Sequence, residues 1–242
     1  MEHANVLNSG NGRADCTIDL DRLLTPTPFP SGFKRENPTA FRFQPYSRKI
    51  RRRLDIYTPI LYDLWVAVEW DPSIRMFNER VEPISVGCTN GKVFKFTPRM
   101  VTMTKDGECV VHTLSSTESE AGINDSESVE NWATKHRIIC KVWTPEEIRL
   151  NLVEIENRKQ LYAYISSPET VISPACREKV FVVLRRYRNT TLDDLVASVA
   201  DMSAEQVIQI VAEQIMQGNL YTDIHKYQFG WSTEVSCFHE FT

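Results

Sequence analysis

The chain has 242 residues, 42% hydrophobic and 25% charged, with a formal net charge of −4 and a pI of about 5.8. This composition is typical of a globular protein with one or two domains. No apolar run approaches the roughly 20 residues that a membrane helix needs, and the polar N-terminus lacks an apolar signal core. We therefore expect a cytoplasmic protein without a membrane partner. The acidic charge argues against nucleic-acid binding over the whole surface but allows a local basic patch.

Residues 1–38 are rich in Asn, Gly, Pro, Ser and Thr, which is typical of a flexible arm. The six cysteines are scattered and include no C-x-x-C pair, so we expect reduced thiols rather than a zinc site or a disulfide framework. Soon after the arm, five positive charges occur within seven residues, at Arg48, Lys49, Arg51, Arg52 and Arg53. This run suits contacts with DNA phosphates, and a solvated charge run is an equally good interpretation.

A helix followed by two hairpins is predicted for residues 61–114. Apolar residues recur at helical spacing from Leu61 to Val68, and Asp71-Pro72 ends the run. Asn90-Gly91 and Asp106-Gly107 are dipeptides that suit tight hairpin turns. The four strand-like segments are 81–86, 92–97, 100–104 and 109–114.

The next segments are more mixed. The Ser- and Glu-rich stretch 115–128 is predicted to be a loop, although its acids could pass for a metal site. A helix is expected over 127–135 and a buried strand over 137–142. Thr144-Pro145-Glu146-Glu147 is a capping-box pattern with proline at the first helical position, so a further helix begins there. A domain boundary is expected at 166–173.

Three helices and a β-hairpin are predicted for the rest of the chain, in the order of a winged helix. The third helix, which begins after Ser203, carries two acids and no Lys or Arg. DNA phosphates would repel such a helix, so docking onto a protein partner is favoured over sequence-specific DNA reading. The predicted hairpin pairs 220–227 with 231–235 around Gly230. Cap and stop residues mark the helices at Ser173, Thr191, Ser203 and Gly218.

Taken together, residues 40–240 resemble the TnsA-type endonuclease subunit of heteromeric (TnsABC) DNA transposases. The resemblance rests on the order of four segments, 69–74 (EWDPSI), 97–100 (TPRM), 105–111 (KDGECVV) and 143–149 (WTPEEIR), with Asn157 beyond them. It implies an α/β fold with a restriction-endonuclease-like core, a mixed sheet flanked by helices, at 39–167 and a winged-helix domain at 168–242. It also implies that the partners are double-stranded DNA and the transposase and AAA+ ATPase subunits of the same element.

In that family two carboxylates hold divalent ions beside the scissile phosphate, and a lysine helps to activate the attacking water. Carried over by position, these roles fall on Leu61, Arg99, His112 and Leu114. Arg99 places a cation where Mg²⁺ would be held, and two like charges repel there. The resemblance thus implies a catalytically degenerate member with no metal cofactor, in which Arg99 contacts a DNA phosphate in the groove that holds the active site in the family. The favoured expectation is a non-catalytic TnsA-like subunit of a DNA transposition complex.

Two other functions remain open. Asp63, Glu69, Asp106, Glu108 and His112 are close in sequence and could form a relocated Mg²⁺ site of an active endonuclease. Against this, Asp63 lies about 200° around the helix from Leu61, and acids beside Gly107 suit the geometry of a turn. The second alternative is a transcription regulator that binds DNA through its winged helix, with a strong dependence of affinity on salt.

Overall fold

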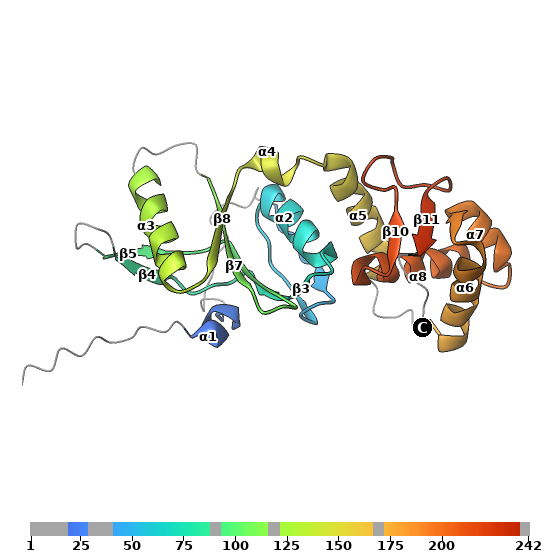
Figure 1. Ribbon diagram of the computed structural model, residues 1–242, viewed down its shortest axis with the longest axis horizontal. Helices are drawn as coiled ribbons and strands as arrows, with labels where there is room; N and C mark the ends of the chain where they lie inside the picture. Colours follow the sequence, from blue (N-terminus) through green and yellow to red (C-terminus); the bar gives the residue numbers. More distant parts are fainter. Residues whose placement is uncertain (1–18, 29–40, 88–92, 116–121, 167–171, 238–242) are drawn as a thin grey trace, which may run out of the picture.

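The computed structural model describes residues 19–28, 41–87, 93–115, 122–166 and 172–237 (Figure 1). A mixed four-stranded sheet with the order β3-β6-β7-β8 forms the centre of the N-terminal part. Strands β3 (Ile74–Asn78), β6 (Met100–Thr104) and β7 (Cys109–Leu114) are antiparallel, and β8 (Ile139–Trp143) runs parallel to β7. Helices flank this sheet, so the α/β class with a mixed sheet is confirmed.

Helix α2 (Pro59–Trp70) packs against one face of the sheet. The Thr58 side chain accepts a hydrogen bond from the Leu61 N–H, and Pro59 occupies the first turn, where its missing N–H costs nothing. Leu64, Trp65 and Val68 of this helix share a buried cluster with Phe77 of β3 and Met100 of β6. The helix that the apolar spacing predicted is therefore confirmed, with two further residues at each end.

The opposite face of the sheet is covered by α1 (Leu20–Leu24), α3 (Gly122–Lys135) and a two-stranded hairpin of β4 (Ile84–Gly87) and β5 (Val93–Phe96). The prediction of a loop over 115–128 is wrong from residue 122 onward, where α3 begins. A parallel pair such as β7 and β8 requires a crossover connection, usually a helix, and α3 supplies it. The inner side of α3 is buried and includes Val129, Trp132 and Ala133.

Three strand predictions need correction. Strand β3 was not predicted, and the strand expected over 81–86 begins only at Ile84. The strand expected over 137–142 is β8, which begins at Ile139 and ends at Trp143; it is an edge strand with Ile139 48% exposed, and not the buried strand expected. The predicted turn at Asn90-Gly91 falls outside the described residues. At the other predicted turn, Asp106-Gly107, Gly107 lies between β6 and β7 and has φ +88. Its left-handed backbone is the conformation for which glycine is suited.

The capping box at Thr144 is confirmed at the start of α4 (Pro145–Ile148), and α5 (Leu152–Ile165) follows it. The predicted caps at Ser173, Thr191 and Ser203 are also confirmed, and Gly218 ends the last helix with φ +79. Strands β10 and β11 pair as an antiparallel hairpin, as expected, but β10 ends at Thr222 and β11 begins only at Glu234, so the predicted strands 220–227 and 231–235 and the turn around Gly230 need correction. Strand β9, which was not predicted, joins their sheet in the order β10-β11-β9. The bounds are α6 (Pro174–Tyr187), β9 (Asn189–Thr191), α7 (Leu192–Ser198), α8 (Ala204–Gln217), β10 (Leu220–Thr222) and β11 (Glu234–Cys237).

A single cluster of buried side chains joins the two halves of the chain. It includes Trp65 of α2, Leu161 of α5 and Ile210 of α8. Helix α8 lies beside α5, and every residue from 207 to 214 is buried (Figure 1). A Cβ on Gly218 would come within 2.9 Å of Pro72 Cβ, so the end of α8 closely approaches the segment that follows α2. No helix in the described ranges is long and apolar enough to cross a membrane.

The buried side chain of Asn157 on α5 holds the connection between β10 and β11. Its Nδ2 donates to the carbonyls of Ile224 and Tyr227, each at 2.7 Å, and its Oδ1 accepts from the Phe229 N–H at 2.9 Å. We expect Asn157→Ala to lower the free energy of unfolding by about 2–4 kcal/mol, because buried backbone groups lose their partners. Urea denaturation measures this. The exposed neighbour variant Gln160→Ala is the control, and equal losses for the two variants would contradict the assignment.

Candidate functional site

Three of the four positions at which the resemblance places catalytic residues lie together, Arg99 directly before β6 and His112 and Leu114 on β7. The Arg99 N–H donates to the His112 carbonyl at 2.9 Å, and His112 is paired with Met100 across the strands. Leu114 is two residues further along β7 and therefore on the same face as His112. Leu61 and Leu114 are half-buried and pack against the same core cluster. The Arg99 side chain is exposed.

His112 is held by two hydrogen bonds and is only 5% exposed. The Trp143 indole Nε1 donates to His112 Nδ1 at 2.9 Å, and Nε2 of His112 lies 2.9 Å from Thr102 Oγ1. Because an indole N–H can only donate, Nδ1 is the acceptor and the ring proton lies on Nε2. The imidazole is also stacked on the Trp143 ring, and Lys141 Nζ lies 3.5 Å from the centroid of that ring.

Burial, together with the nearby Lys141 charge, lowers the pKa of His112 to about 4. The ring is therefore neutral at physiological pH. Both of its nitrogens are already engaged within the protein, since one accepts from the indole and the other donates to Thr102. Neither nitrogen is available to a metal ion in this arrangement, and the geometry of the ring indicates a structural role.

The acids that could form a relocated metal site are distributed over different regions. Asp63 and Glu69 are six residues apart on α2, which corresponds to about 9 Å along the helix axis. Asp106 and Glu108 are exposed beside the turn between β6 and β7, where the Glu108 N–H donates to Thr104 Oγ1 at 3.0 Å. Within the described ranges there is no group of three His, Cys, Asp or Glu residues that could hold a metal ion.

The basic segment folds back as a small hairpin of β1 (Tyr46–Ser47) and β2 (Arg52–Arg53) against the end of α2. Its anchor is Glu69, whose side chain is fully buried. One carboxylate oxygen accepts from Ser47 Oγ at 2.7 Å, and the other accepts from the backbone N–H groups of Arg48 and Lys49 at 2.7 and 3.3 Å. Burial raises the pKa of Glu69, and these hydrogen bonds oppose the rise.

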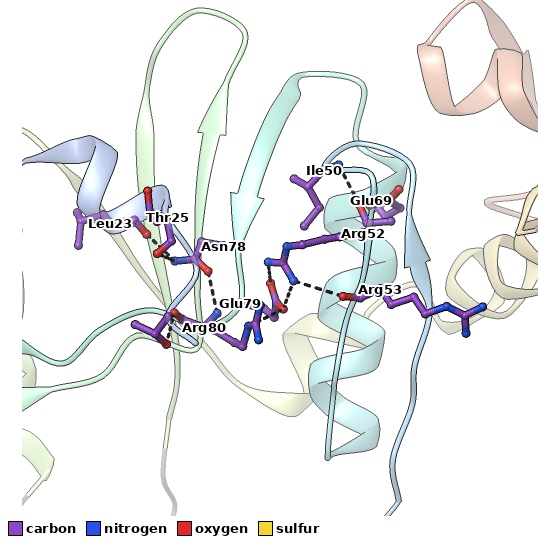
Figure 2. A network of polar contacts seen from close by, with 11 residues as sticks. Leu23, Thr25, Ile50, Arg52, Arg53, Glu69, Asn78, Glu79 and Arg80 are labelled. Carbon is purple, nitrogen blue, oxygen red and sulfur yellow. Dashed lines mark hydrogen bonds and ion pairs between the residues drawn. The ribbon is translucent and has the colours of Figure 1, made fainter. Parts of the chain in front are cut away.

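Three of the five cations in this segment bind internal partners. Arg48 donates to the Ile165 carbonyl and pairs with Glu213 of α8 at 2.9 Å, and Glu213 is also paired with Arg177. Lys49 Nζ lies 2.5 Å from the Asp71 carbonyl and 2.7 Å from the Ile74 carbonyl. The guanidinium of Arg52 makes two hydrogen bonds to the Glu79 carboxylate, at 2.7 and 2.5 Å, as Figure 2 shows.

The remaining cations, Arg51 and Arg53, are exposed, as is Arg99. In Figure 2 the side chain of Arg53 points away from the Arg52–Glu79 pair. Arg51 occupies the turn between β1 and β2 with φ +52, a left-handed conformation that disfavours residues with a Cβ. The conformation of this turn would favour glycine over arginine at that position.

A surface pocket that sequence reasoning missed has a volume of about 400 Å³ and lies between the N-terminus of α2 and the start of α5. Asp63, which is 2% exposed, lines it, and its two oxygens each lie 2.6 Å from a cation, Arg149 Nε and Lys159 Nζ. Burial alone would lower the pKa of Lys159, but its hydrogen bonds to Asp63 and Glu156 outweigh this effect and raise it. Arg149 is 86 residues from Asp63 in sequence, so no local pattern could have indicated the pair.

Comparisons with known proteins do not extend this description. The sequence matches no protein-family model, and no curated protein matches it significantly.

The state of His112 gives a pH-dependence prediction. Because the folded protein takes up this proton only near pH 4 while an unfolded histidine takes it up near pH 6.5, stability falls as the pH is lowered from about 6.5 to 4. The contribution of this group is at most about 1.4 kcal/mol per pH unit. We expect its Cε1–Hε1 NMR signal, assigned with His112→Gln, to remain that of a neutral ring down to about pH 5. A midpoint near pH 6.5 in the folded protein would contradict this.

Proposed function

We propose that this chain is a non-catalytic TnsA-like subunit of a DNA transposition complex, which contacts DNA and docks onto transposase and ATPase partners. The observation that carries the proposal is the identity of the residues at the four family positions, in a protein that has a mixed sheet of the expected kind. Leu61 and Leu114 have no ligand atoms, Arg99 is a cation, and both ring nitrogens of His112 are engaged within the protein. A scaffold of this type without its metal ligands suits an assembly role better than hydrolysis.

The order of elements in the C-terminal part supports a winged-helix domain within this proposal. Helix, strand, helix, helix and two strands follow one another as α6, β9, α7, α8, β10 and β11. The third helix of such a domain often enters the major groove. Here α8 is buried over eight consecutive residues beside α5, so it has no free face for a groove. This burial disfavours a transcription regulator that reads DNA through α8, and we propose docking onto proteins through other surfaces of the domain.

DNA contact is proposed for the outward cations Arg51, Arg53 and Arg99. Arg48, Lys49 and Arg52 then serve to position the hairpin, because their charged groups bind Glu213, backbone carbonyls and Glu79. Arginine at the left-handed position 51 costs about 1 kcal/mol relative to glycine. A functional requirement for a positive charge at the tip of the turn would account for this cost.

Substituting Arg51 tests DNA binding and folding stability separately, because the two are expected to change in opposite directions. We expect Arg51→Gly to raise stability by about 0.5–1 kcal/mol, because the left-handed strain is relieved. The same variant should weaken duplex DNA binding roughly threefold to tenfold and reduce the salt slope by about one. The matched control is Arg137→Gly, an exposed arginine with φ +58 between α3 and β8. Fluorescence anisotropy at several salt concentrations measures affinity, and equal affinity losses for the two variants would contradict the proposal.

A second test concerns catalysis. We expect no Mg²⁺- or Mn²⁺-dependent nicking of supercoiled plasmid and no saturable heat in a calorimetric titration with either ion, because the described residues include no group of three His, Cys, Asp or Glu side chains that could hold a metal ion. Nicking that is abolished by Asp63→Asn or Glu108→Gln would refute the non-catalytic assignment and establish the relocated nuclease. DNA binding can be measured in the same preparations, so an inactive protein is distinguished from a misfolded one.

A further inference from the structure

The pocket beside Asp63 has an apolar wall that is open to solvent. Phe43 and Tyr62 stack with their ring centroids 4.5 Å apart, and Leu152, 49% exposed, also lines the pocket. Two further apolar side chains nearby in sequence are strongly exposed, Phe41 at 64% and Leu150 at 89%, and Phe41 stacks on Phe43. An exposed apolar side chain such as Leu152 in the lining of a cavity is a mark of an interaction site.

The charges in the pocket are arranged with the acid inside and a cation outside. Asp63 is 2% exposed, whereas its partner Arg149 is 44% exposed. Only Nε of Arg149 has a hydrogen-bond partner within the described part of the chain, so its two terminal nitrogens can donate to a ligand. Asp63, Arg149, Lys159 and Glu156 sum to zero charge, so the pocket offers short-range donors to an anion and no long-range attraction.

Tyr62, Leu152 and the cation Arg149 line the same pocket, so a ligand that contacts both kinds of group carries an apolar group and a carboxylate within the span of one pocket. In an extended peptide, neighbouring side chains point to opposite sides, so an acidic residue next to an apolar one would point away from the pocket. A chain terminus meets the requirement, because its side chain and its α-carboxylate are bonded to the same Cα. Capture of a terminal carboxylate is a known mode of peptide recognition, and arginine binds carboxylates through two parallel hydrogen bonds.

We propose that this pocket binds the C-terminal residue of a partner protein, with its apolar side chain against Tyr62 and Leu152 and its α-carboxylate on Arg149. The proposal does not rest on transposition or on DNA contact, because none of Arg51, Arg53 and Arg99 lines the pocket.

The test uses the full chain and three small probes followed by saturation-transfer NMR. N-acetyl-L-phenylalanine carries the side chain and the carboxylate, its carboxamide lacks the charge, and N-acetyl-Phe-Asp-amide carries the acid on the next residue. We expect a Kd of about 1 mM for the first probe. The other two should bind at least about fivefold more weakly, because they lose the charge-assisted pair.

Two variants assign the contacts. Arg149→Gln should abolish the preference for the carboxylate, and Leu152→Asn, at a half-exposed position that tolerates substitution, should weaken all probes about threefold. Arg75→Gln, an exposed arginine on β3, is the control and should change nothing. Equal binding of the acid and its amide, tighter binding of the Phe-Asp probe, or no binding of any probe up to about 20 mM would each overturn the proposal.

Discussion

The buried carboxylate of Glu69 is the constraint on which the arrangement of this protein depends. A carboxylate removed from water is costly unless hydrogen bonds compensate it. Here the compensation comes from Ser47 Oγ and the backbone N–H groups of Arg48 and Lys49. The basic hairpin must therefore fold onto the end of α2. Once it does, the side chain of Arg48 is brought to Glu213 of α8, so a single buried charge fixes the hairpin and α2 and helps to hold α8.

The same logic distinguishes Glu69 from His112, two of the buried polar groups of the N-terminal part. Glu69 sits where hydrogen bonds to its charged form partly offset the cost of burial. His112 sits where nothing offsets that cost, so its pKa falls to about 4 and it remains neutral. The stacked Trp143 and the Thr102 hydroxyl then use both ring nitrogens. In a metal-dependent nuclease this face of the strand would need groups that stay charged, or free to ligate, in the presence of water. Its chemistry here is that of a closed core, which is why we propose an assembly role and not hydrolysis.

Sequence reasoning succeeded where the determining contacts are local. The caps at Thr144 and Ser203 and the left-handed Gly218 involve residues within a few positions of one another, so their patterns were sufficient. It failed where the determining partner is distant. Strand β3 is defined by its pairing with β6, and β9 by its pairing with β11. The pocket was missed for the same reason, because Asp63 meets Arg149 only after folding. The run of five cations gave no sign that Arg52 would be neutralised by Glu79 while Arg51 would remain outward in a strained turn.

Sites that bind an anionic partner are therefore best sought at exposed cations that are not committed to a buried carboxylate. A cation that is paired with a buried carboxylate has exchanged its contacts with water for that carboxylate. A ligand can bind such a cation only by leaving the buried carboxylate unpaired, at a cost of several kcal/mol. Arg48, paired with the 5% exposed Glu213, and Arg52, paired with the 5% exposed Glu79, are in this situation. Arg51 and Arg53 are exposed, and Arg149, whose side chain is 44% exposed, binds Asp63 through its Nε. Because each can bind an anion without breaking a contact of the fold, the surfaces around these groups are the ones for which we propose partner recognition.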